Sequence, residues 1–588
     1  MNFLLKKLIL FLAGLAVAAT SCTQKRDLSQ NTVIVHILAE PKGLHPTNDN
    51  NAYQRMIFMC TQSRLMTFDM VQNKTVPDLL AKPPELLPDS LSYRCLLRDD
   101  IKWDDGSPAT IEDVIFTFKL IVFPLINNPD QKAFFENFRE LIPDPLHNNG
   151  FIVINKKRYF DNEGALSQVC LLQKKYWDPS GLLDQFSFTQ LTGQDFSGAQ
   201  SAALEAFASS FNHADNARNP QKLQGLGPYK VSSWQTGNSI TLERKNNWWG
   251  KGLPETFRQA WPEKIIFTVI KDMEAVVLAL KKENIDVSME LSTAALKKLQ
   301  KRSYFNNKYT SDFIGSFSYT YMGMNMKPEG SRPAFFTDKL VRKAMAHLVP
   351  VDEIIQVSAK GVGKRIASFG LPGQVDYNAD LMPPAFDIEK AKKLLDAAGW
   401  KDLDGDNIRE KTINGVKQPF SFALSYMVSP VTREIALLIR NAMYQAGIDA
   451  RPDPMDFSVF YERAARHDFD AMLGSWSASA GPEDPRQLWH TSNWANHGSN
   501  FTGFGNTYTD SLIQQMNKEL NPAKRKQMMM HFQALVAEEQ PYVFMYNATR
   551  KIAIHKRFDN AGMYPERPNV ILNNLKLKTV KDATPSSM

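Results

Sequence analysis

Cysteine is scarce in this sequence: the 588 residues include 4, and no two of them form a Cys-x-x-Cys pair. Zinc ribbons and dithiol redox centres therefore lack their usual ligands. The Gly-x-Ser-x-Gly, His-Glu-x-x-His and P-loop patterns are missing too, and the 10 histidines are scattered. These absences argue against the enzyme classes that such motifs mark. We expect no catalytic residue, no resident metal and no cofactor.

A strong excess of one charge is also missing. The chain has 69 Lys and Arg against 62 Asp and Glu, a net charge of +7, and no basic block forms a stripe. This balance indicates a solvated surface and argues against nucleic-acid binding. With 43% apolar residues, a chain of this length can bury large cores and divide into several lobes.

Long apolar runs are confined to the N-terminus. Two lysines occur in the first 7 residues, and the apolar run Leu8–Ala19 is too short to span a bilayer as a helix. This order is typical of an export signal, which we assign to residues 1–21. The ending Ala19-Thr20-Ser21-Cys22 resembles the lipobox of bacterial lipoproteins, although the usual Leu is missing at Ala19. We expect lipidation of Cys22 and a periplasmic or cell-surface protein anchored to a bacterial membrane; ordinary cleavage beside an unmodified Cys22 is the alternative.

Three cysteines remain beyond Cys22: Cys60, Cys95 and Cys170. An odd number cannot all pair internally, and a chain of this size needs no disulfide framework. Cys95 lies in an alternating, strand-like pattern, so we expect it to be a small core residue.

Strand and helix patterns alternate along the whole chain. Residues 31–38 and 93–97 are strand-like, and Thr110 with Asp113 forms a potential capping box before a helix. Three further apolar patterns with helical spacing begin at Val341, Ala391 and Ile435. The second is preceded by Asp387 as a cap, and Gly399 and Gly447 are stop signals for the last two. The alternation predicts α/β lobes.

The segment Tyr93–Phe118 carries a dense set of motif residues: Leu97-Arg98-Asp99, Lys102-Trp103, Asp105-Gly106, Pro108, Thr110 and Asp113-Val114. These residues resemble the signature of the family 5 solute-binding proteins, the peptide, dipeptide and nickel receptors of ABC importers. Further matches follow in the family's order, among them Ala39-Glu40-Pro41, Gly225–Tyr229, Trp248-Trp249-Gly250, Met322–Asn325 and Ala391–Leu395. The resemblance covers nearly all of the chain beyond the signal.

The resemblance implies an α/β fold of the periplasmic-binding-protein type II. Such a fold has two lobes with mixed sheets, a third domain, and a ligand cleft between the lobes. The implied division is domain I in three parts (residues 22–75, 225–315 and 541–588), domain II (76–224) and domain III (316–540).

One segment resembles the family's cleft wall: Gly474–Pro485, in which Trp476 and Ala478 match and Ser477 between them is a further candidate ligand contact. In peptide-binding members an aspartate holds the peptide's α-ammonium, and Ser479 stands at its place here. A neutral hydroxyl cannot make the charge-assisted bond of a carboxylate. Glu483 and Asp484 offer carboxylates at neighbouring positions. Plain core packing is the alternative role for Trp476.

Other candidate ligand contacts are Glu40, which occupies a cleft position in the family, and a loop containing Trp489, Asn500 and Phe501. Glu40 is alternatively a solvated turn residue, and the loop an ordered surface loop. His490 and His497 in the same loop are weak candidates for nickel ligands.

The acidic run 402–407, Asp-Leu-Asp-Gly-Asp-Asn, has calcium-loop composition. However, its sixth position is Asn407, not Gly, and its twelfth is Ile413, not Glu. We therefore predict a hairpin turn.

These patterns predict an extracytoplasmic lipoprotein, a monomer, that captures short peptides and delivers them to the permease and ATPase subunits of an ABC importer. One alternative is a receptor of the same fold for modified peptides, nickel or other metal complexes, or oligosaccharides. Another is a sensor or chaperone without a transport role.

Overall fold

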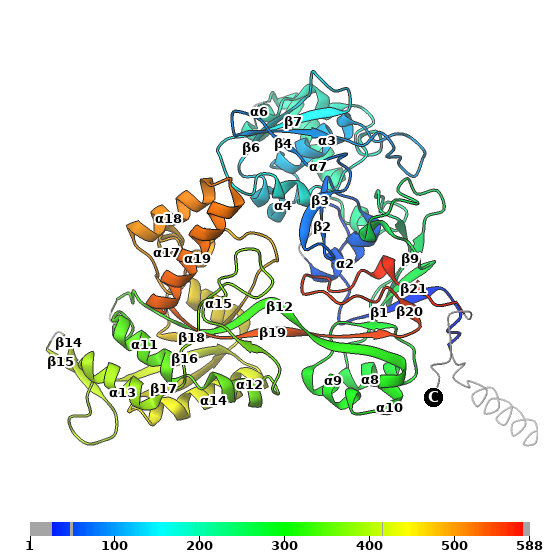
Figure 1. Cartoon of the computed structure of the whole chain (residues 1–588). Helices are drawn as coiled ribbons and strands as arrows, with labels where there is room; N and C mark the ends of the chain where they lie inside the picture. Colours follow the sequence, from blue (N-terminus) through cyan, green and yellow to red (C-terminus); the bar gives the residue numbers. More distant parts are fainter. Residues whose placement is uncertain (1–25, 48–50, 195, 331, 414, 580–588) are drawn as a thin grey trace, which may run out of the picture.

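The computed structural model describes residues 26–47, 51–194, 196–330, 332–413 and 415–579, so Cys22 and the predicted signal lie outside it. Figure 1 shows three bodies, named here by their place in that view. The right body contains β1 and β9, the left body β16 to β18, and the upper body β4 to β7. Within the described residues, no helix is long and apolar enough to cross a membrane.

One large mixed sheet runs through both lower bodies. Its strands lie in the order β17 (Asp449–Met455), β16 (Ser421–Met427), β18 (Ala471–Ser477), β12 (Tyr309–Met324), β19 (Tyr542–His555), β11 (Val287–Ser288), β1 (Thr32–Ile37), β10 (Lys264–Val269), β9 (Ser239–Arg244) and β8 (Tyr229–Gln235), with β13 (Lys364–Arg365) beside β19.

The antiparallel strands β12 and β19 connect the two lower bodies. They have 16 and 14 residues and pair from Tyr309↔His555 in the right body to Gly323↔Tyr542 in the left body. Their register shifts between Gly315 and Tyr319. A register shift bends a ladder locally, so the crossing strands are irregular between the two bodies.

The right body packs helices against the sheet. Val33, Val35 and Ile37 of β1 are fully buried, as the period of two in a strand predicts. The other elements here are α2 (Ala52–Thr61), β2 (Met66–Asp69), β3 (Lys74–Pro77), η4 (Thr256–Arg258), α8 (Met273–Lys281), α9 (Thr293–Gln300), α10 (Ser303–Lys308), β20 (Phe558–Asp559), η5 (Leu572–Asn574) and β21 (Lys576–Leu577).

The upper body contains a separate antiparallel sheet in the order β4 (Glu85–Leu86), β5 (Ser92–Leu96), β7 (Gly150–Asn155) and β6 (Phe138–Pro143). The predicted capping box of Thr110 and Asp113 is confirmed at the start of α3, and Cys95 is buried in the core as expected. The remaining elements are α3 (Ile111–Val122), α4 (Pro129–Phe134), η1 (Gly164–Gln168), α5 (Lys174–Trp177), η2 (Leu182–Gln185), α6 (Phe188–Gly193), α7 (Gly198–Phe211) and η3 (Ala214–Ala217).

The left body has helices on both faces of its strands (Figure 1). The Asp387 side chain caps its predicted helix, and Gly399 and Gly447 adopt positive φ angles just after the last two predicted helices. Its elements are α11 (Lys339–Leu348), α12 (Val351–Val357), α13 (Ile388–Ala397), β14 (Glu410–Ile413), β15 (Val416–Pro419), α14 (Pro430–Tyr444), α15 (Phe457–Ala465), α16 (Arg486–Trp489), α17 (Ser492–Ala495), α18 (Thr507–Lys518) and α19 (Pro522–Glu539). The predicted α/β lobes are confirmed, whereas the predicted domain limits stay a prediction.

Candidate functional site

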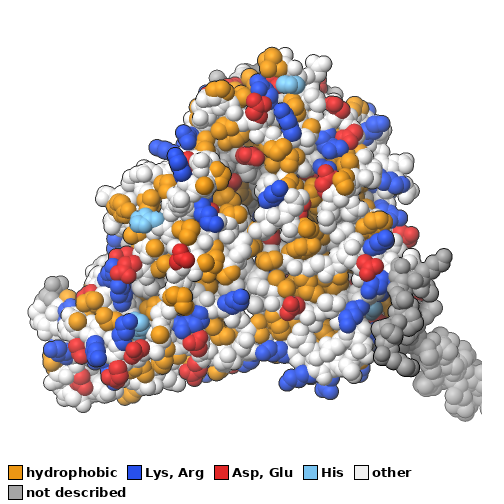
Figure 2. All heavy atoms as spheres, in the orientation of Figure 1, with side chains coloured by type: hydrophobic (Ala, Val, Ile, Leu, Met, Phe, Trp, Pro, Cys, Tyr) orange, Lys and Arg blue, Asp and Glu red, His pale blue; other side chains and the backbone are white. Residues whose placement is uncertain are grey.

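A cavity of about 680 Å³ lies where the three bodies meet. Its wall includes Tyr159 and Asp161 of the upper body, residues 476–479 of the left body, and Arg550 and Arg567 near the right body. Figure 2 shows a recess on the viewed face between the upper body and the left body. This volume falls in the range of small-molecule sites, which proteins often place between domains.

The end of β18 brings the predicted cleft segment to the cavity. Trp476, Ser477, Ala478 and Ser479 all line it. The Ser477 hydroxyl lies 2.8 Å from the Ser318 hydroxyl of β12, and the Ala478 N–H donates to the Phe317 carbonyl at 2.6 Å. Because β12 holds the segment in this way, the indole of Trp476 is half-buried between the core and the cavity.

One edge of β18 carries no partner strand near the cavity. The pairing with β12 continues to Ser318↔Ser477, whereas the pairing with β16 ends at Tyr426↔Leu473. Among the described residues, no other strand pairs with β18 beyond that point. The backbone of residues 474–477 therefore has no strand partner on one side, and Trp476 and Ser477 of this stretch line the cavity.

Glu483 follows the cleft segment and also lines the cavity. The Gln374 side-chain amide donates to both the Glu483 Oε1 atom and the Ser479 carbonyl, each at 2.8 Å. Burial raises the pKa of the Glu483 carboxyl to about 7, although the Gln374 hydrogen bond and the charge of Arg525 oppose the shift. Within the described residues, the Glu483 Oε2 atom accepts no hydrogen bond. Glu483 therefore has a carboxylate oxygen available to a ligand.

Asp484 is engaged in contacts across the cavity entrance. Its Oδ2 atom accepts from the Tyr159 hydroxyl of the upper body at 3.1 Å, and its Oδ1 atom accepts from the Asn517 amide at 2.8 Å. The Phe160 N–H donates to the Asn517 carbonyl at 2.9 Å, and the Arg525 guanidinium lies 3.6 Å from the centre of the Phe160 ring. The upper and left bodies thus touch, and the cavity is closed on this side.

A second acidic group lies in the same corner. Asp161 of the upper body lines the cavity, and burial raises the pKa of its carboxyl to about 7, with Asp484 adding to the increase and Arg525 opposing it. A ligand ammonium placed here would favour the charged forms of these carboxyls.

The other predicted contacts divide into two groups. Trp489 lines the cavity but is fully buried. Glu40, Asn500 and Phe501 are not part of the lining. Glu40 accepts hydrogen bonds from the Trp234 indole at 2.8 Å and the Gly237 N–H at 3.0 Å, and pairs with Arg218 at 3.1 Å.

Asn500 and Phe501 fix the loop in which they lie. The Asn500 amide donates to the carbonyls of His490 and Phe504 at 3.2 and 2.9 Å, and Phe501 packs in the left-body core. His490 and His497 do not form a metal-binding group among the described residues. Asn500 and Phe501 do not line this cavity, so the ligand contacts predicted for them stay a prediction.

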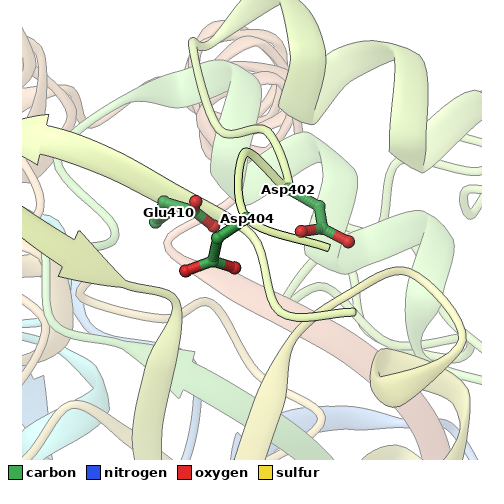
Figure 3. A group of neighbouring side chains, drawn as sticks. All are labelled: Asp402, Asp404 and Glu410. Atoms are coloured by element: carbon green, nitrogen blue, oxygen red, sulfur yellow. The ribbon is translucent and has the colours of Figure 1, made fainter. Parts of the chain in front are cut away.

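The acidic run 402–407 forms a series of turns between α13 and β14. Asp402, Asp404 and Glu410 lie close together (Figure 3), and one carboxylate oxygen of each lies within 4.8 Å of the other two. The Lys417 ammonium is ion-paired with Asp404, and with Glu410 at 3.2 Å. Asp402 accepts the N–H groups of Gly405 and Asn407. These carboxylates thus already have protein partners, in keeping with the predicted turn.

Sequence reasoning missed the cationic part of the cavity. Arg55 lines it from α2, and Arg550 and Arg567 line it from the C-terminal part of the chain, about 500 residues further on. Tyr159 and Asp161 were missed for the same reason. None of these residues lies in a motif, so a single sequence contains no local signal that would join them.

The sequence of this chain is similar to a known protein family and to characterised relatives. The model of the bacterial extracellular solute-binding proteins, family 5 Middle, matches residues 74–498. The oligopeptide-binding protein AppA of Bacillus subtilis (strain 168) is 27% identical over 500 residues, covering 83% of this chain and 81% of AppA.

Two solved structures have the same fold. The structure of AppA from Bacillus subtilis in complex with a nonapeptide matches with a TM-score of 0.67 and 22% identity, over 93% of this chain and 99% of AppA. NikZ from Campylobacter jejuni in complex with Ni(L-His) matches with a TM-score of 0.64 and 20% identity, over 90% of this chain and 95% of NikZ. The predicted two-lobed fold is confirmed by these matches.

Proposed function

Because the chain belongs to family 5 of the bacterial extracellular solute-binding proteins, we propose that it captures short peptides and delivers them to an ABC importer. The observation that carries the proposal is the open edge of β18 at the wall of a cavity of ligand size that lies between the bodies. An extended peptide has backbone N–H and C=O groups that can pair with the unpaired backbone groups of this edge. Closure of the lobes around it then presents a distinct surface to the permease.

Pairing with the backbone of residues 474–477 gives affinity that does not depend on the peptide's side chains. Trp476 offers an indole face to the peptide's apolar groups, and the hydroxyls of Ser477 and Ser479 offer polar contacts. Backbone pairing that provides most of the affinity, with few contacts to particular side chains, suits a receptor that accepts peptides of varied sequence.

The peptide's ammonium group is the point at which this chain departs from the family pattern. Ser479 supplies no charge, and Glu40 lies outside the cavity lining in contact with Arg218 and Trp234. Asp484 is engaged with Tyr159 and Asn517. Glu483 and Asp161 are the two carboxylates left at this corner. We assign the ammonium contact, where a ligand has one, to Glu483, which follows the cleft segment and has an oxygen without a hydrogen bond among the described residues.

Calorimetry with a peptide selected from a mixture of short peptides tests the proposal. N-methylation of backbone N–H groups that face β18 should weaken binding a few-fold to about tenfold for each bond lost. Trp476→Ala should weaken binding further, whereas Trp261→Ala, a change at an indole outside the cavity lining, should not. Equal affinity for methylated and unmethylated peptides, or no peptide binding at all, would reject the proposal.

We further propose that the protein binds its ligand without converting it. The family consists of solute-binding proteins, and the sequence lacks the catalytic motifs noted above. Mass spectrometry of a peptide after incubation with the pure protein should return its original mass. A cleaved or modified peptide would contradict this proposal.

The membrane anchor is a separate proposal that depends on Cys22, which precedes the described residues. Cys22→Ala should block lipidation and release the protein from the membrane fraction, or stop its processing. An unmodified Cys22 peptide together with unchanged membrane association would count against the anchor.

A further inference from the structure

A basic surface covers the lower edge of the right body, where α8, α9 and α10 lie (Figure 1), and Figure 2 shows Lys and Arg side chains along the same edge. This basic face consists of exposed side chains of the three helices: Lys281, Lys282, Lys298, Lys301, Arg302 and Lys308. Among the described residues, only Lys308 of this set has an ion pair, with Glu283 at 3.3 Å. Residues 291–311 include five Lys and Arg and no acid, and the exposed acids Asp272 and Glu274 lie at the opposite end of α8. The basic face therefore carries a positive charge that the described part of the protein leaves largely unpaired.

The basic face contains a groove of about 460 Å³ with apolar side chains in its wall. Lys281, Lys298, Lys301 and Arg302 line it together with Val277, Leu299 and Tyr304. The Lys281 Nζ atom lies 5.9 Å from the centre of the Tyr304 ring. Tyr304 is 37% exposed, and Leu278, on the same face of α8 as Lys281, is 49% exposed. Cations beside exposed apolar and aromatic side chains suit the boundary between lipid headgroups and acyl chains.

The described chain begins next to the basic face. The Arg26 guanidinium donates to the carbonyl of Glu283, just after α8, at 3.2 Å. The Arg557 guanidinium donates to the Leu28 carbonyl at 2.6 Å, so this start of the chain is fixed on the right body. Cys22 precedes Arg26 by four residues, which span at most about 14 Å when fully extended. A lipid on Cys22 would therefore hold this part of the right body close to the membrane surface.

We propose that the basic face docks on the anionic headgroups of the membrane that holds the anchor. Each exposed Lys or Arg is attracted to an anionic lipid surface, and a basic cluster next to a lipid anchor adds a second membrane contact. The recess in Figure 2 lies between the upper and left bodies, away from this edge, so docking leaves it uncovered. The inference adds an orienting contact to the proposed anchor and does not depend on peptide capture.

Cosedimentation with vesicles measures the contact. The mature chain, residues 22–588, is used with Cys22→Ala, so that no acyl group contributes to binding. Vesicles of phosphatidylethanolamine mixed with phosphatidylglycerol should bind this protein, and vesicles of phosphatidylethanolamine mixed with phosphatidylcholine should not. Added salt should weaken the binding, because exposed charges are screened beyond about 8 Å at physiological ionic strength.

Two variants of equal net charge isolate the basic face. Loss of one positive charge should weaken vesicle binding about fivefold, so Lys281→Gln, Lys298→Gln and Lys301→Gln together should weaken it about a hundredfold. The matched control combines Lys390→Gln, Lys393→Gln and Lys526→Gln, at exposed lysines of α13 and α19 in the left body. The control should bind vesicles as the parent does.

A fluorescent probe tests the orientation on the membrane. The cysteines of the described residues, Cys60, Cys95 and Cys170, are buried, so an environment-sensitive fluorophore can be attached selectively to an introduced thiol. On Tyr304→Cys its emission should shift to the blue when phosphatidylglycerol vesicles are added. On Tyr508→Cys, at a tyrosine of α18 that is 57% exposed, it should not shift.

The outcomes separate this surface from the anchor. Absent binding to the anionic vesicles, equal binding to both vesicle types, a basic-face variant that behaves as its control, or equal shifts of the two probes would overturn the docking surface. A basic face that serves an acidic partner protein instead would give the first of these results. Because no acyl group is present in these measurements, an unmodified Cys22 in the cell would reject the anchor without changing them.

Discussion

Removal of the Tyr159 hydroxyl isolates one contact between the upper and left bodies. In the closed structure this hydroxyl donates to the Asp484 carboxylate at 3.1 Å, and Asp484 keeps its bond from Asn517 when the hydroxyl is lost. Burial and the charge of Asp484 raise the pKa of Tyr159, so the phenol is a donor throughout the neutral range. Tyr159→Phe therefore removes one charge-assisted hydrogen bond and little else.

The magnitude follows from the type of bond. A hydrogen bond to a charged group contributes about 1.5–3 kcal/mol, which is about tenfold to a hundredfold in an equilibrium constant. If the ligand is held only in the closed form, the whole loss appears as weaker binding, because the apparent affinity scales with the population of that form. We expect the lower half of this range, since the Asp484 carboxylate can exchange the lost donor for water.

Calorimetry measures the affinity, and small-angle X-ray scattering of the liganded protein measures closure. Tyr508→Phe is the matched control, because the Tyr508 hydroxyl is exposed and contacts only His531 among the described residues. Unchanged affinity and compactness of Tyr159→Phe would refute the view that this contact holds the cleft closed.

Two further predictions concern the ammonium corner. Because Glu483 is assigned to the ammonium in place of the family's aspartate, acetylation of the peptide's N-terminus should weaken binding about tenfold to a hundredfold in calorimetry; equal affinity for the free and the acetylated peptide would contradict this assignment. Burial raises the pKa of Glu483 from 4.5 to about 7. Between these two pH values the folded protein therefore keeps a proton on Glu483 that the unfolded chain has released. The free energy of unfolding should therefore rise as the pH falls from about 7 to about 4.5, and Glu483→Gln should flatten this dependence in urea titrations; an identical slope in both proteins would speak against the assigned pKa.

Local patterns predicted most of the fold. The period of two in β1, the capping box before α3 and the Asp387 cap of α13 are all interactions between residues close in sequence. The resemblance of residues 474–485 to the family's cleft segment located part of the cavity wall, because one strand end carries that whole segment.

The remaining site depends on contacts that no local pattern records. Glu40 was predicted as a ligand contact, but Arg218 and Trp234, far away in the sequence, already satisfy its carboxylate. Arg550 reaches the cavity because β19 crosses between the bodies, and Arg567 reaches it from the segment between β20 and η5. The Tyr159 contact with Asp484 joins two residues that are 325 positions apart in the sequence.

Native mass spectrometry of the protein purified from its own cells tests the central claim most directly. We predict that the protein carries an excess mass that dissociates as short peptides, and that Trp476→Ala reduces the bound fraction. An excess mass that proves to be a metal complex, a haem group or an oligosaccharide, in the absence of any peptide, would contradict the account.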